Sequence, residues 1–148
     1  IIYDTMWNST KKMAEAIARG INAADGSITV KLYNVGKQDK NDIITEVFKS
    51  RAILMGSLTI NRGILSGAAG ILEEIKGLSF SGKKAAAFGS YGWSGESVKI
   101  ITEELRAAKF EVINEGLKCL WTPDQENEAR CYEFGQEMVA ALEGWKKV

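Results

Sequence analysis

The chain has 148 residues, with 19 basic and 19 acidic side chains and a net charge of zero. This length suits one domain with a substantial core, and a neutral chain gives no electrostatic basis for binding nucleic acid or an anionic membrane. The apolar stretches are too short for a membrane-spanning helix of roughly 20 residues. The sequence has no histidine, which excludes His-based catalysis and nearly all His-ligated metal sites, so any chemistry has to come from a bound group.

The start of the chain and its cysteines indicate the setting of this domain. The first predicted strand is only about three residues long and begins at Ile1, so we expect a few residues, or a whole metal-binding domain, to precede it. Residues 1–148 themselves are expected to form a single domain. Cys119 and Cys131 do not form a C-x-x-C pair, and isolated cysteines are typical of free thiols in a reducing cytoplasm.

Strand and helix patterns alternate along the whole chain. Strands are predicted at 1–3, 27–33, 51–56, 84–89 and 111–120. Helices are predicted from apolar faces that run from Met13 to Ile21, Ile43 to Phe48, Leu65 to Ile75, Val98 to Ala108 and Tyr132 to Trp145. Residues 52–56 are continuously apolar, which is typical of a strand covered on both faces. The alternation favours an α/β fold in which helices cover both faces of a parallel sheet.

Three of the loops that follow strands are rich in Gly, Ser, Thr, Asn and Trp: residues 4–10, 57–63 and 90–95. In such sheets ligands bind beyond the carboxyl ends of the strands, where the strand order reverses, so these loops are expected to meet at one site. The first loop opens a helix, and the free amides and dipole of a helix N-terminus favour an anion. The alternative is an ordinary N-cap made by Ser, Thr or Asn. The convergence of three loops favours a phosphate site.

Several other phosphate-binding schemes do not fit. The dinucleotide fingerprint requires a Gly-x-Gly pair, which the sequence lacks. Residues 77–84 resemble a P-loop but precede a strand and lack the hydroxyl that binds magnesium. A single phosphate attached to a flat, largely apolar group remains, with Trp7 and Trp93 as candidate stacking surfaces. Core packing is the alternative for each tryptophan; we expect it for Trp145, and Trp121 is left open between the two.

The loop sequences resemble those of a known family. Residues 5–10 are similar to the FMN-phosphate loop of flavodoxins, in the variant found in the flavodoxin domain of flavodiiron proteins, also called A-type flavoproteins. Residues 56–61 and 89–95 resemble that family's two ring-binding loops, and residues 121–125 resemble the start of its last helix. The resemblance covers essentially the whole chain. It implies a three-layer flavodoxin-like sandwich with a five-stranded parallel sheet of order 2-1-3-4-5, and FMN as cofactor.

The resemblance also implies a function. It indicates an FMN electron-transfer module that takes electrons from a rubredoxin-like donor or a flavin reductase and passes them to a di-iron domain that reduces oxygen or nitric oxide. Relatives pair head to tail, so a homo-oligomer is expected. One alternative is a free-standing flavodoxin-type shuttle, and a further one is an NAD(P)H:quinone reductase of the same fold. No side chain is assigned as catalytic or as a metal ligand.

The expected contacts with FMN fall into three groups, one for each loop. The phosphate group is Thr5, Met6, Trp7, Asn8, Ser9 and Thr10; the ring groups are Ser57, Leu58, Thr59, Ile60, Asn61 and Gly63, and Ser90, Tyr91, Gly92, Trp93, Ser94 and Gly95. Leu58 and Ser66 stand where the family usually has proline, which affects the rigidity of the ring loop. Arg62 is expected to stabilise the reduced, anionic ring and to raise its second one-electron potential; a solvated surface charge is the alternative.

Overall fold

The structure is a computed structural model, and it describes residues 1–143 of the chain. Trp145, predicted on the buried side of the last helix, lies outside the described residues. The strands are β1 (Ile2–Asp4), β2 (Tyr33–Asn34), β3 (Ala52–Ser57), β4 (Lys84–Tyr91), β5 (Glu111–Val112) and β6 (Leu117–Leu120). The helices are α1 (Ser9–Ala24), α2 (Lys40–Lys49), α3 (Ser66–Leu78), α4 (Glu96–Ala107) and α5 (Gln125–Glu143). Strands and helices alternate up to β5, as the periodicity predicts.

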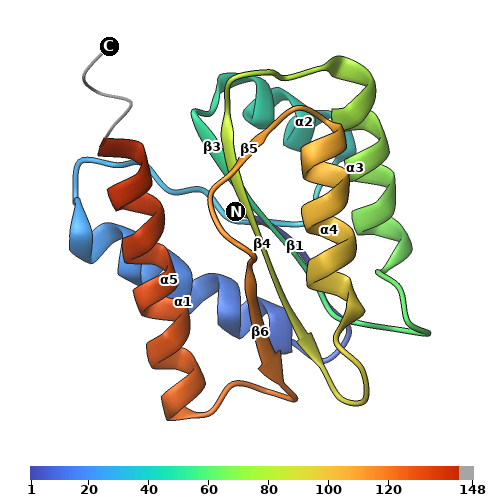
Figure 1. The fold of residues 1–148 in the computed structure, drawn as a ribbon, viewed down its shortest axis with the longest axis vertical. Coiled ribbons are helices and arrows are strands. Elements are labelled where there is room, and N and C mark those ends of the chain that lie inside the picture. Colours follow the sequence, from blue (N-terminus) through green and yellow to red (C-terminus); the bar gives the residue numbers. More distant parts are fainter. Residues whose placement is uncertain (144–148) are drawn as a thin grey trace.

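The strands form one parallel sheet whose order is β2-β1-β3-β4-β5 (Figure 1), which confirms the predicted order. The predicted fifth strand at 111–120 is wrong in one respect, because it is two strands that both pair with β4. Between them Asn114 Oδ1 accepts a hydrogen bond from the Gly116 amide at 2.9 Å, and Gly116 has φ +88°. This Asx turn interrupts the run and shifts the later part of it along β4.

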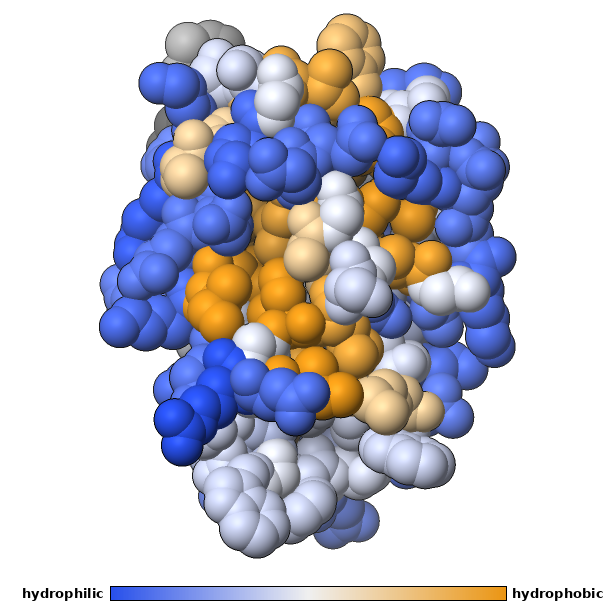
Figure 2. Space-filling view, turned by 90° about the vertical axis from the view of Figure 1, so that its right-hand side faces the viewer, coloured by the Kyte–Doolittle hydropathy of each residue, from blue (hydrophilic) through white to orange (hydrophobic). Residues whose placement is uncertain are grey.

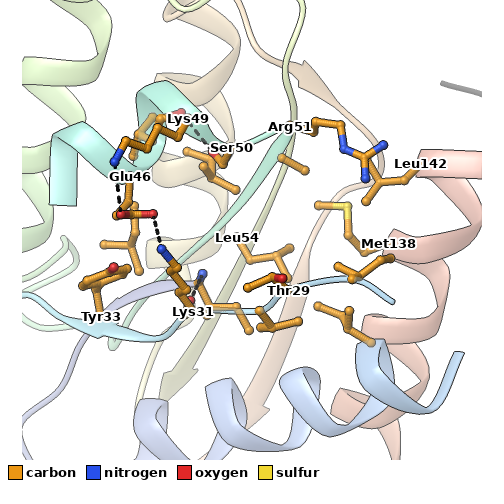
Figure 3. Close-up of a pocket in the computed structure, with 18 of the residues that line it drawn as sticks. Thr29, Lys31, Tyr33, Glu46, Lys49, Ser50, Arg51, Leu54, Met138 and Leu142 are labelled. Atoms are coloured by element: carbon orange, nitrogen blue, oxygen red, sulfur yellow. Dashed lines mark hydrogen bonds and ion pairs between the residues drawn. The ribbon is translucent and has the colours of Figure 1, made fainter. Parts of the chain in front are cut away.

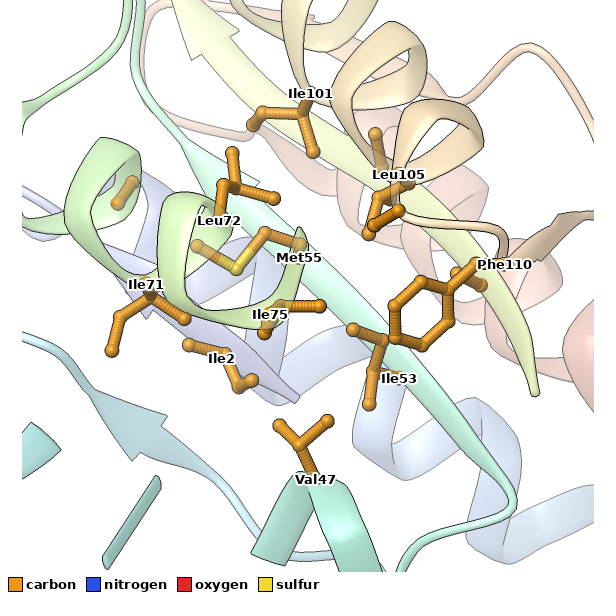
Figure 4. Close-up of a cluster of buried hydrophobic side chains, with 14 of the residues drawn as sticks. Ile2, Val47, Ile53, Met55, Ile71, Leu72, Ile75, Ile101, Leu105 and Phe110 are labelled. Carbon is orange, nitrogen blue, oxygen red and sulfur yellow. The ribbon is translucent and has the colours of Figure 1, made fainter. Parts of the chain in front are cut away.

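Helices cover both faces of the sheet, so the prediction of three layers is confirmed (Figure 1). On one face α2, α3 and α4 pack over the strands, and Figure 4 shows Ile53 and Met55 of β3 meeting Leu72 and Ile75 of α3. On the other face α1 and α5 pack over Leu54 and its neighbours. Within the described residues, no helix is long and apolar enough to cross a membrane.

Helices α1 and α5 lie unusually close to each other because both carry a glycine at the contact. A Cβ at Gly20 would lie 2.0 Å from the Tyr132 carbonyl oxygen, and one at Gly135 would lie 2.2 Å from the Ile17 carbonyl oxygen. Each backbone therefore fills the space that a side chain would need. This contact lies in the carboxyl-terminal half of α1.

Two local predictions are wrong, one for a strand and one for a helix face. Residues 27–33 were predicted as a strand, but β2 contains only Tyr33 and Asn34. Residues 28–32 still alternate between half-buried and exposed positions, yet β1 begins at Ile2 and offers them no ladder partner. Phe48 was predicted to face inward on α2, but it is 72% exposed and touches only the edge of Phe80 among aromatic rings, at 5.9 Å between ring centroids.

Candidate cofactor site

The three polar loops lie at one end of the molecule, as predicted. Strands β1, β3 and β4 are neighbours and run parallel, so residues 5–8, 58–65 and 92–95 follow their carboxyl ends at the same edge of the sheet. This edge is the lower end of the molecule in Figure 1, and Figure 2 shows that end in pale colours, of intermediate hydropathy. On the face that Figure 2 shows, residues of intermediate hydropathy therefore gather at this end.

The first loop leaves the N-terminus of α1 without a side-chain cap. Asn8 occupies the N-cap position with φ 60°, and its side chain makes no capping hydrogen bond. The first turn of the helix contains no acidic residue. The ordinary Asn or Ser cap considered from the sequence is therefore wrong, and the first-turn amides remain available to an anion.

Hydroxyl groups line the same place, and one of them lacks a partner. Thr5 Oγ1 is buried and has no hydrogen-bond partner among the described residues. Ser9 Oγ lies 2.7 Å from Ser90 Oγ, and Thr10 Oγ1 lies 3.5 Å from the same atom. These two contacts use two of the three hydroxyl protons in that cluster, so one proton is left to donate elsewhere. A phosphate group fits this arrangement, because it would satisfy the Thr5 hydroxyl, the remaining proton and the first-turn amides.

The second loop is held by hydrogen bonds to its neighbours. The Thr59 amide donates to the Ser90 carbonyl at 2.9 Å, and Thr59 Oγ1 accepts from the Ser97 amide at 3.1 Å, at the start of α4. Ser57 Oγ donates to the Leu58 carbonyl at 2.9 Å and accepts from the Leu65 amide at 3.1 Å. These bonds fix the loop although Leu58 is not a proline.

The tip of the second loop is a tight turn. Ile60 and Gly63 exchange two backbone hydrogen bonds, of 3.1 and 2.8 Å, and form an isolated antiparallel bridge. Asn61 and Arg62 between them have φ values of 49° and 59°, which are the conformations of a type I′ turn. The turn projects the exposed Asn61 and Arg62 side chains beyond the sheet edge.

The third loop presents aromatic surface to solvent. Trp93 is 92% exposed and Trp7, on the first loop, is 81% exposed. Such large apolar side chains have little reason to stay in water unless a ligand or partner covers them. Core packing, the alternative considered from the sequence, is therefore wrong for both tryptophans.

Trp121, left open by the sequence, also belongs to this edge. Its amide donates to the Tyr91 carbonyl at 2.7 Å, and its ring lies so close to Gly92 that a Cβ there would be 2.6 Å away. The ring is 63% exposed. Lys118 of β6, which sequence reasoning did not single out, also lies at this edge, against Gly95. The resemblance of residues 121–125 to the family's last-helix start was the only signal.

The charges beside the loops balance one another. A hydrogen bond from Ser94 and one from its own backbone amide lower the pKa of Glu96, and the positive charges of Arg62 and Lys118 lower this pKa further. One carboxylate oxygen of Glu96 is buried and has no hydrogen-bond partner in the described part of the chain. Arg62 therefore acts on Glu96 as well as on anything bound at the loop edge.

Metal-binding groups are not assembled at this edge. Among residues 1–143, no three His, Cys, Asp or Glu side chains are grouped closely enough to hold a metal ion. Cys119 and Cys131 are buried free thiols whose sulfur atoms lie 4.0 Å apart. Their hydrogen bond lowers the pKa of Cys119 and raises that of Cys131.

Comparison with known proteins agrees with this geometry. The flavodoxin family matches residues 1–135. The chain is 52% identical over 136 residues to an anaerobic nitric oxide reductase flavorubredoxin of Aliivibrio fischeri, covering 92% of this chain and 27% of that protein. It is 46% identical over 139 residues to the flavorubredoxin of Escherichia coli, covering 94% and 29%. The chain thus spans less than a third of the length of these relatives.

Solved structures show the same likeness. The rubredoxin oxygen:oxidoreductase of Desulfovibrio gigas superposes with a TM-score of 0.94 at 35% identity, over 99% of this chain and 36% of that one. An archaeal flavodoxin superposes with a TM-score of 0.86 at 29% identity, over 96% of both chains. The resemblance to the flavodoxin domain of flavodiiron proteins is therefore confirmed. This chain belongs to the flavodoxin family, and its cofactor is FMN.

Proposed function

We propose that this domain relays electrons from a reduced redox protein to a di-iron domain that reduces nitric oxide. FMN, when bound, supplies the electron storage and transfer. The observation that carries the proposal is an uncapped α1 N-terminus beside the buried, unpartnered Thr5 hydroxyl. The relatives at 46% and 52% identity are named nitric oxide reductases, which favours nitric oxide over oxygen as the final substrate. The donor is a rubredoxin-like protein or a flavin reductase.

The first loop is proposed to hold the phosphate. The first-turn amides of α1 would donate to its oxygens, and Thr5 Oγ1 would gain the hydrogen bond that it lacks among residues 1–143. Ser9 and Thr10 are already linked to Ser90, so their share in the binding is smaller than that of Thr5. Met6, Trp7 and Asn8 are exposed and supply backbone donors and covering surface.

The other two loops are proposed to hold the ring. Trp7 and Trp93 offer their exposed faces to it, and the type I′ turn places Asn61 at its edge. The second and third loops would form the two walls of the ring site. Their residues are Ser57, Leu58, Thr59, Ile60 and Gly63 on one side, and Ser90, Tyr91, Gly92, Ser94 and Gly95 on the other. Stacking of Trp7 and Trp93 on a bound ring would exclude water from it.

The exposed aromatic edge also bears on partners. Trp7, Trp93 and Trp121 stay more than half exposed, and a protein that docks over them would bring its own redox centre close to the ring. We propose a homo-oligomer in which this edge faces the di-iron domain of another copy. A cytoplasmic location is supported by the two free thiols, which a reducing compartment preserves.

A free-standing electron shuttle is the second candidate. It is favoured by one observation: an archaeal flavodoxin matches this chain over 96% of both lengths. A shuttle and a relay domain would share the same FMN site. They differ in whether a metal domain belongs to the same polypeptide.

The relay is tested by anaerobic reduction of the FMN-loaded protein. Reduced rubredoxin is mixed with the protein in a stopped-flow instrument, and flavin absorbance is followed with and without NADH. The proposal predicts rapid bleaching by rubredoxin and little by NADH alone. Addition of an isolated di-iron domain and nitric oxide should then restore the absorbance. Fast bleaching by NADH without a protein donor would contradict the relay and indicate a reductase. Reoxidation only by unrelated acceptors would favour the shuttle.

A further inference from the structure

The two cysteines of the chain form a buried pair that lies outside the three loops. Cys119 belongs to β6 and Cys131 to the first part of α5, and both side chains are fully buried. Both are free thiols, and their sulfur atoms lie 4.0 Å apart, with no room for another atom between them. A disulfide bond is about 2.05 Å long, so each sulfur has to move by only about 1 Å to form one.

The two thiols differ in reactivity. The hydrogen bond between them lowers the pKa of Cys119 and raises that of Cys131, because a proton held on Cys131 stabilises a thiolate on Cys119. The positive charge of Arg130 lowers the pKa of Cys119 further. The thiolate is the form of cysteine that attacks an oxidant. Cys119 is therefore the better nucleophile of the two.

Cys119 lies directly behind the cofactor edge. In the ladder between β4 and β6 it is the partner of Ser90, whose carbonyl and hydroxyl hold the first two loops. Two residues later the Trp121 amide donates to the Tyr91 carbonyl at 2.7 Å, and the Trp121 ring packs on Gly92. The segment between the two cysteines is therefore part of the support of the third loop.

The same segment covers the thiols. Leu120 is 50% exposed and Trp121 is 63% exposed, and exposed segments of this kind open locally at a low cost in free energy. The cavity of about 440 Å³ in Figure 3 lies at the other end of the sheet, beside Leu54 and Met138, and neither cysteine is among the described residues that line it. Opening of residues 120–124 is therefore the route by which a small, uncharged molecule reaches the pair.

We propose that Cys119 and Cys131 are a site of reversible oxidation, at which hydrogen peroxide converts the two thiols into a disulfide that displaces Trp121 and the third loop. The Cys119 thiolate attacks one peroxide oxygen, the O–O bond breaks, and the other oxygen takes a proton and leaves as water. The Cys131 sulfur then displaces hydroxide from the sulfenic acid on Cys119, and the Cys131 proton completes the second water. The two thiols lose two electrons and two protons, and one peroxide becomes two waters.

The disulfide acts on the third loop through the short segment between the sulfurs. Pairing with β4 holds Cys119 in place, so closing the 4.0 Å gap draws the start of α5 toward β6. The bond from Trp121 to Tyr91 is made at the wider spacing and is weakened by this movement. On the proposed FMN site, on which this step rests, FMN binds the disulfide form about tenfold more weakly. By linkage, FMN raises the midpoint potential of the thiol pair by about 30 mV and so protects the thiols.

The test begins with FMN-free protein treated with hydrogen peroxide, followed by catalase and mass spectrometry after alkylation in denaturant. The chain should lose both thiols and two hydrogens, stay a monomer, and recover both thiols with dithiothreitol. Cys131→Ala should stop at a sulfenic acid on Cys119, which dimedone traps. Cys119→Ala should react at least about tenfold more slowly, since only the weaker nucleophile remains.

The effect on the third loop is measured in the same samples. Amide exchange at Trp121 should be about tenfold faster in the disulfide form, because its bond to Tyr91 opens more often. FMN affinity should fall by about tenfold and return with dithiothreitol. The control is a variant with alanine at both cysteines, because peroxide also oxidises methionine and Met6 is 51% exposed at this edge. Peroxide should leave its FMN affinity and its Trp121 exchange as those of the untreated variant.

Three outcomes would overturn the proposal. The first is survival of both thiols under peroxide that oxidises Met6. The second is a disulfide between chains in place of one within the chain. The third is a disulfide that leaves Trp121 exchange unchanged. A disulfide that speeds Trp121 exchange but leaves FMN affinity unchanged would support the oxidation site and count against the assignment of the third loop to the FMN ring.

Discussion

Replacing Thr5 by valine gives the sharpest test of the cofactor site. Thr5 Oγ1 is buried and has no partner among the described residues, and valine keeps the shape of the side chain while removing that oxygen. A hydrogen bond to a charged group contributes about 1.5–3 kcal/mol, so FMN should bind roughly 10- to 150-fold more weakly. A buried hydroxyl without a partner costs about 1–3 kcal/mol, so the protein without FMN should be equally stable or more stable.

The matched control is Thr102→Val. Thr102 Oγ1, on α4, is also buried without a partner, but it does not belong to any of the three loops. Both variants should leave the unfolding free energy of the FMN-free protein the same or higher in urea titrations. Only Thr5→Val should weaken FMN binding, measured by the quenching of flavin fluorescence. Affinity within about twofold of the original for Thr5→Val would refute the assignment, and so would an equal loss in Thr102→Val.

Two further predictions concern the loop edge. Gly92→Ala should displace the Trp121 ring, since a Cβ would lie 2.6 Å from it. Because that ring is 63% exposed, the free energy of unfolding should change by about 0.5 kcal/mol or less. Tryptophan fluorescence should shift, and FMN should bind more weakly. Arg62→Glu should lower the second one-electron potential of the flavin by on the order of 40 mV in a redox titration, and an unchanged potential would make Arg62 a solvated charge.

Much of the fold was predictable because the residue types of the strands and of the loops after them are distinctive. Residues 52–56 are apolar without interruption, and the polar loops after β1, β3 and β4 mark the carboxyl edge. The division of 111–120 into two strands also had a local signal, Asn114-Glu115-Gly116, which is a turn sequence inside an apolar run. The length of β2 had no such local signal in the sequence. Whether residues 28–32 form a strand depends on a partner across the sheet, which periodicity in one segment does not report.

The site shows the same division between local and long-range information. Hydroxyls, glycines and tryptophans after strands were visible in the sequence, and they do lie at one edge. The hydrogen bond between Ser9 and Ser90 was not visible in the sequence, because it joins residues 81 positions apart. Trp121 reaches the site only because β6 pairs with β4 and brings its end beside Tyr91.

Strand β4 holds the loops together through bonds made within the chain. The Ser90 carbonyl accepts a hydrogen bond from the Thr59 amide, and the Ser90 hydroxyl contacts the Ser9 hydroxyl. The Tyr91 carbonyl accepts a hydrogen bond from the Trp121 amide. The end of one buried strand therefore ties together the first loop, the second loop and the segment after β6. Because these bonds are already made within the chain, FMN binding has little backbone to order. Binding energy then goes into the contacts that the chain alone leaves unmade: the Thr5 hydroxyl, the first-turn amides of α1 and the exposed faces of the tryptophans.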